Sequence, residues 1–338
     1  MQNLPNHTNY DASQIKVLTL AQAVRKRPGM YLGDIDQAAT NMVLELVANA
    51  IDIFLTSKQA SYIKVKIQGQ TITVTDNGGQ FPFDKKCLSD SNFVEHCLTQ
   101  LSYKPTVDNH TPHIHLLIGG AGLAVMNAAS LNMTIECCNG QKTWQQAFAL
   151  GEVLTPASCS LTPDAEPYAT IQTTLDPEIF QQNAPDNYLL HQIFFESVHL
   201  YPGLHIEFKD EHYYQAQGLK ALAHLMTAAT PKTRQFYYHK RDQNIDLQLC
   251  ILGETTDHPQ IKAWVNGTAT VEFGSHVDGV LQALKHLNWQ AAAICVHVMM
   301  LDPKFAAPSR DRLAVPTVTD WIREIILKEL DTNSHSVN

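Results

Sequence analysis

Apolar and polar positions follow the period of a helix between residues 44 and 55. The apolar positions form one stripe, which predicts a helix that lies against a sheet. Glu45, Asn49 and Asp52 fall together on another face of this helix, because residues three and four apart are neighbours on its surface. A polar face within an apolar helix borders something other than the core. The apolar stripe consists of Leu44, Val47, Ile51 and Leu55.

Two runs with a period of two predict a β-hairpin directly after this helix. They cover residues 62–67 and 71–75, and the second run ends in the sequence Asp-Asn-Gly-Gly at residues 76–79. A third segment, residues 118–127, is a glycine cluster that opens an apolar helical run. Backbone amides at such a helix start lack partners within the helix, so they are able to bind an anion.

The remaining periodic runs divide the chain into two parts, and the polar stretch 215–218 lies between them. Strand-like runs before this stretch extend an antiparallel sheet, whereas strands and helices alternate after it. Between residues 82 and 115 the sequence is polar and irregular, which is typical of a lid. The predicted strands are 133–138, 143–150, 169–174, 204–208, 246–252, 261–265 and 292–299, and the predicted helices are 19–26, 219–226, 277–287 and 321–330.

Composition narrows the class of protein. A length of 338 residues favours two domains, and a formal net charge of −9 argues against strong DNA binding by this chain alone. We therefore expect any DNA contact to be indirect or weak. We find no apolar run in the sequence that is long enough to cross a bilayer, and its start does not resemble a signal peptide. We therefore expect no membrane association and a cytoplasmic location. Seven scattered cysteines indicate reduced thiols and no disulfide framework.

The polar positions suggest chemistry on a nucleotide. Glu45 is suited to activate a water molecule, and the Asn49 amide oxygen is a hard ligand for Mg²⁺ on phosphates. Asp76 at a strand end can accept a hydrogen bond from an exocyclic amine such as that of adenine, and Gly78 lets the backbone approach a ligand. Alternatively, the helix face is merely solvated and residues 76–79 form a plain hairpin turn.

Histidines 110, 113 and 115 form an H-x-x-H-x-H pattern that raises the possibility of a metal site. No neighbouring Cys or Glu completes a set of zinc ligands, so we do not favour this interpretation.

The helix face and the two glycine turns, in this order, resemble the nucleotide-binding boxes of the GHKL ATPase superfamily, which includes gyrase, histidine kinases and MutL. The run from Tyr10 to Leu18 and the run from Arg25 to Gly33 resemble the opening of the B subunits of bacterial DNA gyrase and topoisomerase IV more specifically. The resemblance implies a Bergerat-type GHKL α/β sandwich followed by a ribosomal-S5-like transducer domain. It divides the chain into an N-terminal dimerisation arm (1–18), an ATP-binding domain (19–215) and a transducer domain (216–338).

The resemblance also assigns roles to residues that periodicity alone does not single out. Tyr10 contacts the nucleotide of a second protomer and Ile15 packs there, so ATP binding produces a homodimer. Lys104 belongs to the lid. Thr170 falls near the adenine, although a buried strand threonine is an equally good interpretation. The remaining matches are Gly120 and Gly122 as the phosphate-binding glycines and Arg310 at the position of the lysine that reaches the γ-phosphate.

Several positions depart from the pattern of this family. They include Thr40 and Asn41, which stand where a histidine helper usually precedes the glutamate, and Ala48, Gly79 and Gln80, which replace an aspartate, an arginine and a glycine. Two functions compete: an ATP-hydrolysing, nucleotide-gated dimerisation clamp of the topoisomerase type, and a catalytically weak or inactive nucleotide-dependent switch. We favour the first, because the chain keeps Glu45.

Nothing in the sequence resembles the DNA-cleavage domain of a full topoisomerase chain of this type. Strand cleavage is therefore not expected of this chain. A partner protein that carries the DNA gate is the implied complement, whether the chain is a fragment or a free-standing paralogue.

Overall fold

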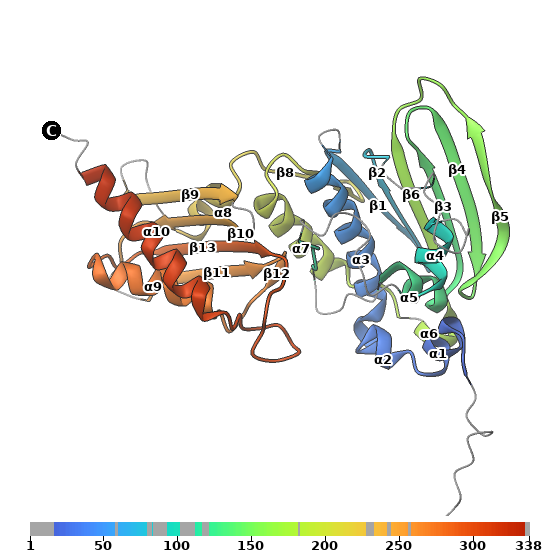
Figure 1. Cartoon of the computed structure of the whole chain (residues 1–338), viewed down its shortest axis with the longest axis horizontal. Helices are drawn as coiled ribbons and strands as arrows, with labels where there is room; N and C mark the ends of the chain where they lie inside the picture. Colours follow the sequence, from blue (N-terminus) through green and yellow to red (C-terminus); the bar gives the residue numbers. More distant parts are fainter. Residues whose placement is uncertain are drawn as a thin grey trace, which may run out of the picture.

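The structure is a computed structural model that describes residues 17–57, 60–79, 83, 93–101, 112–116, 122–181, 183–227, 233–241, 245–255 and 258–334. These residues form two sheets, each with helices packed on it (Figure 1). The larger sheet has the strand order β5-β4-β3-β6-β2-β1-β7-β8. Its strands are β1 (Tyr62–Gln68), β2 (Thr71–Asp76), β3 (Ser130–Cys138), β4 (Lys142–Ala149), β5 (Glu152–Leu161), β6 (Tyr168–Leu175), β7 (His205–Phe208) and β8 (Glu211–Tyr214).

Helices pack on one face of this sheet and position the polar face predicted above. The long central helix is α3, whose aliphatic side chains are buried. The predicted α1 is confirmed, and its start is fixed by a capping box between Thr19 and Gln22. The helices of this part are α1 (Leu20–Lys26), α2 (Gly29–Leu32), α3 (Ile35–Thr56), α4 (Phe93–Thr99), α5 (Gly122–Ala129), α6 (Pro177–Phe180) and α7 (Asn187–Leu200).

Several features of this part differ from the sequence prediction. Helix α4 lies inside the stretch that we expected to be irregular, and both α7 and the exposed edge strand β5 were missed. Strand β7 pairs with β1 in parallel, whereas every other pair in this sheet is antiparallel. Strands β6 and β7 both run in the direction of β1, so the chain must cross from one end of the sheet to the other between them. Helix α7 makes this crossover.

Helix α3 also corrects an expectation about membranes. By length and composition it is apolar enough to span a bilayer, contrary to our interpretation of the sequence. However, 61% of its most apolar window is buried inside the protein. The helix is therefore the core helix against which the sheet packs.

The second sheet has the strand order β12-β11-β13-β10-β9 and lies between two layers of helices. Helices α9 and α10 cover one face, while α8 packs on β10 and β13 from the other side. The central strand β13 is buried throughout, because it is covered on both faces. The elements are α8 (Leu219–Met226), β9 (Gln235–Arg241), β10 (Ile245–Leu252), β11 (Gln260–Val265), β12 (Thr268–Ala269), α9 (Ser275–His286), β13 (Ala293–Met300) and α10 (Pro316–Ser334).

The two parts are joined by a continuous core and by side-chain contacts. Cys295 and Trp264 of the second sheet belong to the same buried cluster as the first-domain side chains. Glu196 on α7 accepts hydrogen bonds from Lys262 Nζ at 2.5 Å and from Trp264 Nε1 at 3.2 Å. The predicted boundary near residue 215 falls between β8 and α8. Helix α7 therefore holds the second sheet at a defined place beside α3.

Candidate active site

The polar face of α3 presents Glu45 and Asn49 one turn apart, as the periodicity predicted. Glu45 Oε1 accepts a hydrogen bond from the backbone N–H of Gly122 at 3.2 Å. The Asn49 side-chain Nδ2 donates to the backbone carbonyl of Glu45 at 2.7 Å, which fixes the orientation of the amide. The Asn49 Oδ1 atom is thus the acceptor end that remains for a ligand.

Burial raises the pKa of Glu45 above its usual range. The hydrogen bond from Gly122 and the positive charges of Arg310 and His113 act in the opposite direction, whereas Asp52 adds to the rise. A carboxylate with a raised pKa is a stronger base once it is ionised, which suits it to take a proton from water. The arrangement around Glu45 therefore fits a general base.

The first glycine turn holds Asp76 at the end of β2. Asp76 Oδ1 accepts the backbone N–H of Gly78 at 2.8 Å, and burial raises the pKa of this carboxyl to about 6 despite the hydrogen bonds from Gly78 and Gly79. Asn77 Oδ1 anchors the turn by accepting the backbone N–H groups of Ser61 and Tyr62 at 2.8 and 2.9 Å. The turn is consequently a fixed platform with a buried acceptor at its centre.

Close packing against α3 requires glycine at position 78. A Cβ atom there would lie 2.4 Å from Cγ2 of Ile53, which is one helical turn beyond Asn49. The contact brings the Asp76 turn to the same end of α3 as Asn49. Two of the predicted pieces thus meet through backbone and aliphatic contacts.

The second glycine turn is described from Gly122 onward, which has a φ of +70° and begins α5. The predicted Gly120 lies outside the described residues, as do Lys104 in the lid and Tyr10 and Ile15 in the arm. Their roles stay predictions.

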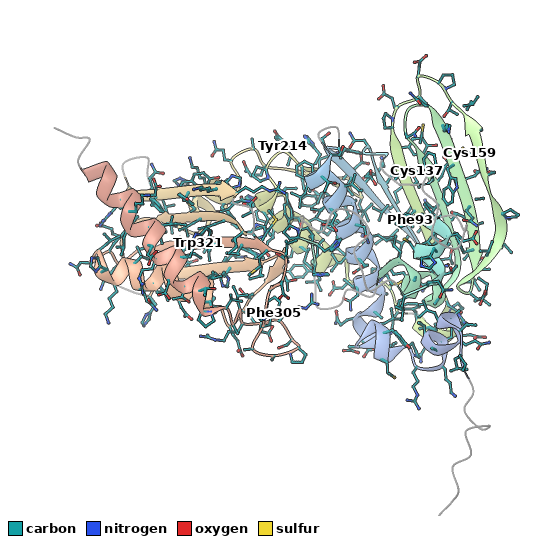
Figure 2. The ribbon with its side chains drawn as sticks, in the orientation of Figure 1. Phe93, Cys137, Cys159, Tyr214, Phe305 and Trp321 are labelled. Atoms are coloured by element: carbon teal, nitrogen blue, oxygen red, sulfur yellow. The ribbon has the colours of Figure 1, made fainter. Side chains whose placement is uncertain are left out.

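Arg310 of the second domain acts on this site through its charge. It lies in the loop between β13 and α10, where Phe305 is labelled in Figure 2, and its charge acts on both Glu45 and His115. Backbone hydrogen bonds between Ala306 and Arg312 and between Ala314 and Lys304 hold the two arms of the loop together. Arg310 has a φ of +59°, an uncommon conformation for a non-glycine residue that is often kept at functional sites.

Thr170 is not brought to Asp76. Its hydroxyl lies 2.9 Å from that of Thr75, the residue directly opposite it on β2. Successive side chains of a strand point to opposite faces, so the Thr170 side chain lies on the sheet face opposite to that of Asp76. The alternative of a structural strand threonine agrees with this position.

Sequence reasoning placed Asp52 on the polar face without a role and missed its partner His113. The His113 Nδ1 atom lies 3.2 Å from Asp52 Oδ2. The histidine-rich pattern did single out this segment, but it pointed toward a metal. Within the part of the chain that the structure describes, no group of three His, Cys, Asp or Glu residues is placed to hold a metal ion.

Thr40, which stands where a histidine helper was expected, has a structural contact. Its hydroxyl accepts the backbone N–H of Asp186, the residue that caps the start of α7. The position therefore connects α3 to α7.

The residues present fit a magnesium nucleotide. Mg²⁺ usually keeps several waters and takes one or two protein oxygens besides phosphate oxygens, which agrees with the single amide oxygen of Asn49. Asp76 is a buried acceptor that could bind a base amine, and Arg310 is a positive group that could bind phosphate. We call the part of the candidate site around Asp76 the base end, and the part around Glu45, Gly122 and Arg310 the phosphate end.

Known proteins are similar to this chain over most of its length. No protein-family model matches the chain. The B subunit of DNA topoisomerase 4 from Rickettsia typhi is 27% identical over 365 residues, which cover 96% of this chain and 55% of that protein. The B subunit of DNA gyrase from Staphylococcus aureus is 27% identical over 340 residues, with coverage of 96% and 51%. The chain thus spans about half the length of the curated relatives it matches.

Solved structures show the same fold. The 43K ATPase domain of Thermus thermophilus gyrase B, in complex with an aminocoumarin, matches with a TM-score of 0.74 and 21% identity, over 94% of this chain and 92% of that one. The ATPase region of Saccharomyces cerevisiae topoisomerase II matches with a TM-score of 0.67 and 15% identity, over 96% and 99%. The predicted α+β GHKL fold and the resemblance of this chain to the ATPase region of the DNA gyrase and topoisomerase IV B subunits are therefore confirmed.

Proposed function

We propose that the chain binds ATP with Mg²⁺ and hydrolyses it as a nucleotide-gated dimerisation clamp. The observation that carries this proposal is Glu45, a part-buried carboxylate that accepts the Gly122 amide and feels the positive charge of Arg310 of the second domain. A carboxylate that only stabilised the fold would have no need of a cation supplied by a separate domain.

Each of these residues is proposed to have one role. Asp76 accepts a hydrogen bond from the adenine amine, and Gly78 orients this carboxylate through its backbone N–H. Asn49 holds Mg²⁺, which neutralises phosphate charge and orients the phosphates when bound. Glu45 takes a proton from the attacking water, and Arg310 stabilises charge on the γ-phosphate. Gly120 and Lys104 are proposed to bind phosphate.

The arm of residues 1–18 is proposed to complete the clamp by crossing to a second protomer, with Tyr10 at the nucleotide. A homodimer would then form when ATP binds, because closure must repay the entropy of ordering the arm. We further propose a cytoplasmic setting and a partner protein that carries the DNA gate, by analogy with the type II topoisomerases that the chain resembles. DNA contact by this chain is indirect or weak.

The alternative is a switch that binds ATP without turning it over. The test compares wild type with Glu45→Gln, a variant whose side-chain oxygen still accepts the Gly122 amide. Turnover should fall by about 10² to 10⁴, the usual contribution of a general base, while nucleotide affinity stays close to that of wild type. Steady-state ATPase assays and calorimetry with a non-hydrolysable analogue measure the two quantities.

A wild type that binds ATP but turns over no faster than Glu45→Gln would establish the switch. A wild type that binds no nucleotide would reject both functions.

A further inference from the structure

Both carboxylate oxygens of Asp52 bind the short segment 112–116. Oδ2 lies 3.2 Å from His113 Nδ1, and Oδ1 accepts the backbone N–H of Ile114 at 3.0 Å. The Asp52 side chain is 22% exposed and that of His113 is 48% exposed. Asp52 follows Asn49 by one turn of α3, so these two bonds attach the segment to the helix that carries the proposed base.

The other end of the same segment is attached to the second domain. His115 N–H donates to the backbone carbonyl of Asn266 at 2.8 Å, and the Thr268 hydroxyl donates to the backbone carbonyl of His115 at 2.7 Å. Gly267 lies between these two contacts. A Cβ atom on Gly267 would lie 3.1 Å from Ile114 Cγ2 and 2.7 Å from the Tyr201 hydroxyl. The β11–β12 turn is thus fitted closely around the segment.

We propose that Asp52 and His113 form a positioning pair that couples the polar face of α3 to the β11–β12 turn of the second domain. This inference rests on the proposed function, because it assigns the coupling to a cycle of ATP hydrolysis. The pair is distinct from Arg310, which approaches Glu45 from another loop. Neither residue takes part in the chemical step; both hold the segment between α3 and the turn in register.

Protonation of His113 governs the strength of the pair. The hydrogen bond to Asp52 and the negative charges of Asp52 and Glu45 raise the pKa of His113, while its burial acts against the rise. Burial, followed by the positive charges of Arg310 and His113, lowers the pKa of the neighbouring His115 to about 4, so His115 is neutral. His113 is therefore charged and paired below its raised pKa, and the charge is lost as the pH rises through that value.

If the hydrogen bond between Asp52 and His113 were purely structural, its removal would have a different effect. Removing it would lower the stability of the fold at every pH, and turnover would keep the pH dependence of wild type. If the pair positions the segment, kcat should instead fall as the pH rises through the pKa of His113. We call this fall the alkaline limb. Glutamine is the matched replacement for His113, because its amide can still donate to Asp52 but does not titrate.

The first measurement does not depend on hydrolysis. NMR titration of His113 in the full chain, without nucleotide, should give a pKa above the ordinary value near 6.5, and Asp52→Asn should remove that elevation. The same pKa in wild type and Asp52→Asn would overturn the pair. Because no ATP is present, this result stands even if the proposed ATPase function fails.

The second measurement is kcat as a function of pH for wild type and His113→Gln. Wild type should lose about fivefold in kcat across the alkaline limb, which is the lower end of typical coupling between sites, with KM nearly constant. His113→Gln should lack this limb. An alkaline limb that persists unchanged in His113→Gln would overturn the coupling role even if the NMR titration shows the pair.

Discussion

The base end and the phosphate end of the proposed nucleotide site are built in different ways. The base end lies within the first domain, where Asp76, its turn and Ile53 of α3 pack directly against one another. The phosphate end is assembled from separate segments: Glu45 on α3, Gly122 at the start of α5, and Arg310 on the loop of the second domain. Only the phosphate end therefore depends on how the second domain is placed relative to the first.

This difference separates binding from turnover. A ligand held mainly at the base end would have similar affinity in any domain arrangement, whereas hydrolysis would need the arrangement that brings Arg310 to Glu45. A contact that differs between two states is what allows a ligand to shift the balance between them. Substitutions at the two ends should consequently affect different kinetic constants.

Among the substitutions that test the two ends, Arg310→Ala should have the largest effect on turnover. Loss of the guanidinium removes charge stabilisation at the phosphate end, and we expect kcat to fall by about 10² to 10³ with little change in ADP affinity. Steady-state ATPase and ADP calorimetry give the two numbers. Arg310→Lys is the matched variant: activity near wild type would show that charge suffices, and activity near that of Arg310→Ala would show that bidentate geometry is required. An equal loss of ADP affinity would contradict the division into two ends.

Asp76→Asn should have an intermediate effect and act on binding. Replacement of a buried carboxylate that accepts the base amine is expected to weaken nucleotide binding about tenfold, with kcat at saturation nearly unchanged. Since the Asp76 pKa is raised to about 6, the affinity of wild type should also decline as the pH falls below that value, because the protonated carboxyl is a poorer acceptor.

The control for this pH effect is the same titration on Asp76→Asn, which retains the pH dependence of the nucleotide phosphates and of the other site residues, such as Glu45, and loses only that of Asp76. If wild type and Asp76→Asn lose affinity in parallel on acidification, Asp76 does not read the base.

Thr268→Val should have the smallest effect. The variant keeps the shape of the side chain and removes the hydroxyl that donates to the His115 carbonyl. Loss of one neutral hydrogen bond corresponds to about a threefold decrease in kcat, without a change in KM, if the β11–β12 turn positions the segment. Thr268→Ser is the control that restores the donor, and a decrease of equal size in both variants would point to packing instead.

Local pattern was sufficient to predict the polar face of α3 and the turn that holds Asp76. Glu45 and Asn49 follow from helical spacing, and Asp76 with Gly78 follows from a strand that ends in a turn. Helix α8 was also predicted within its observed bounds. In each case the residues that determine the structure are close together in the sequence.

Long-range arrangements could not be predicted in this way. Asp52 and His113 are 61 positions apart, and the segment that holds His113 has no periodicity of its own. Helix α7 was missed because apolar and polar positions are mixed on it: Tyr188 and Phe195 are exposed, whereas His199 is buried, so its sequence has no clear helical period. The parallel pairing of β1 with β7 depends on α7, so it was missed for the same reason.

The glycine turn at Asp76 has an evolutionary consequence. Gly79 has a φ of +60°, and a Cβ atom there would lie 2.3 Å from the backbone carbonyl oxygen of Cys138 and 2.7 Å from Pro167. The arginine that the resembling family carries at this position cannot be restored without moving the end of β3. Departures at this turn are therefore mutually dependent, and reversion to the family residue one position at a time would pass through a destabilised protein.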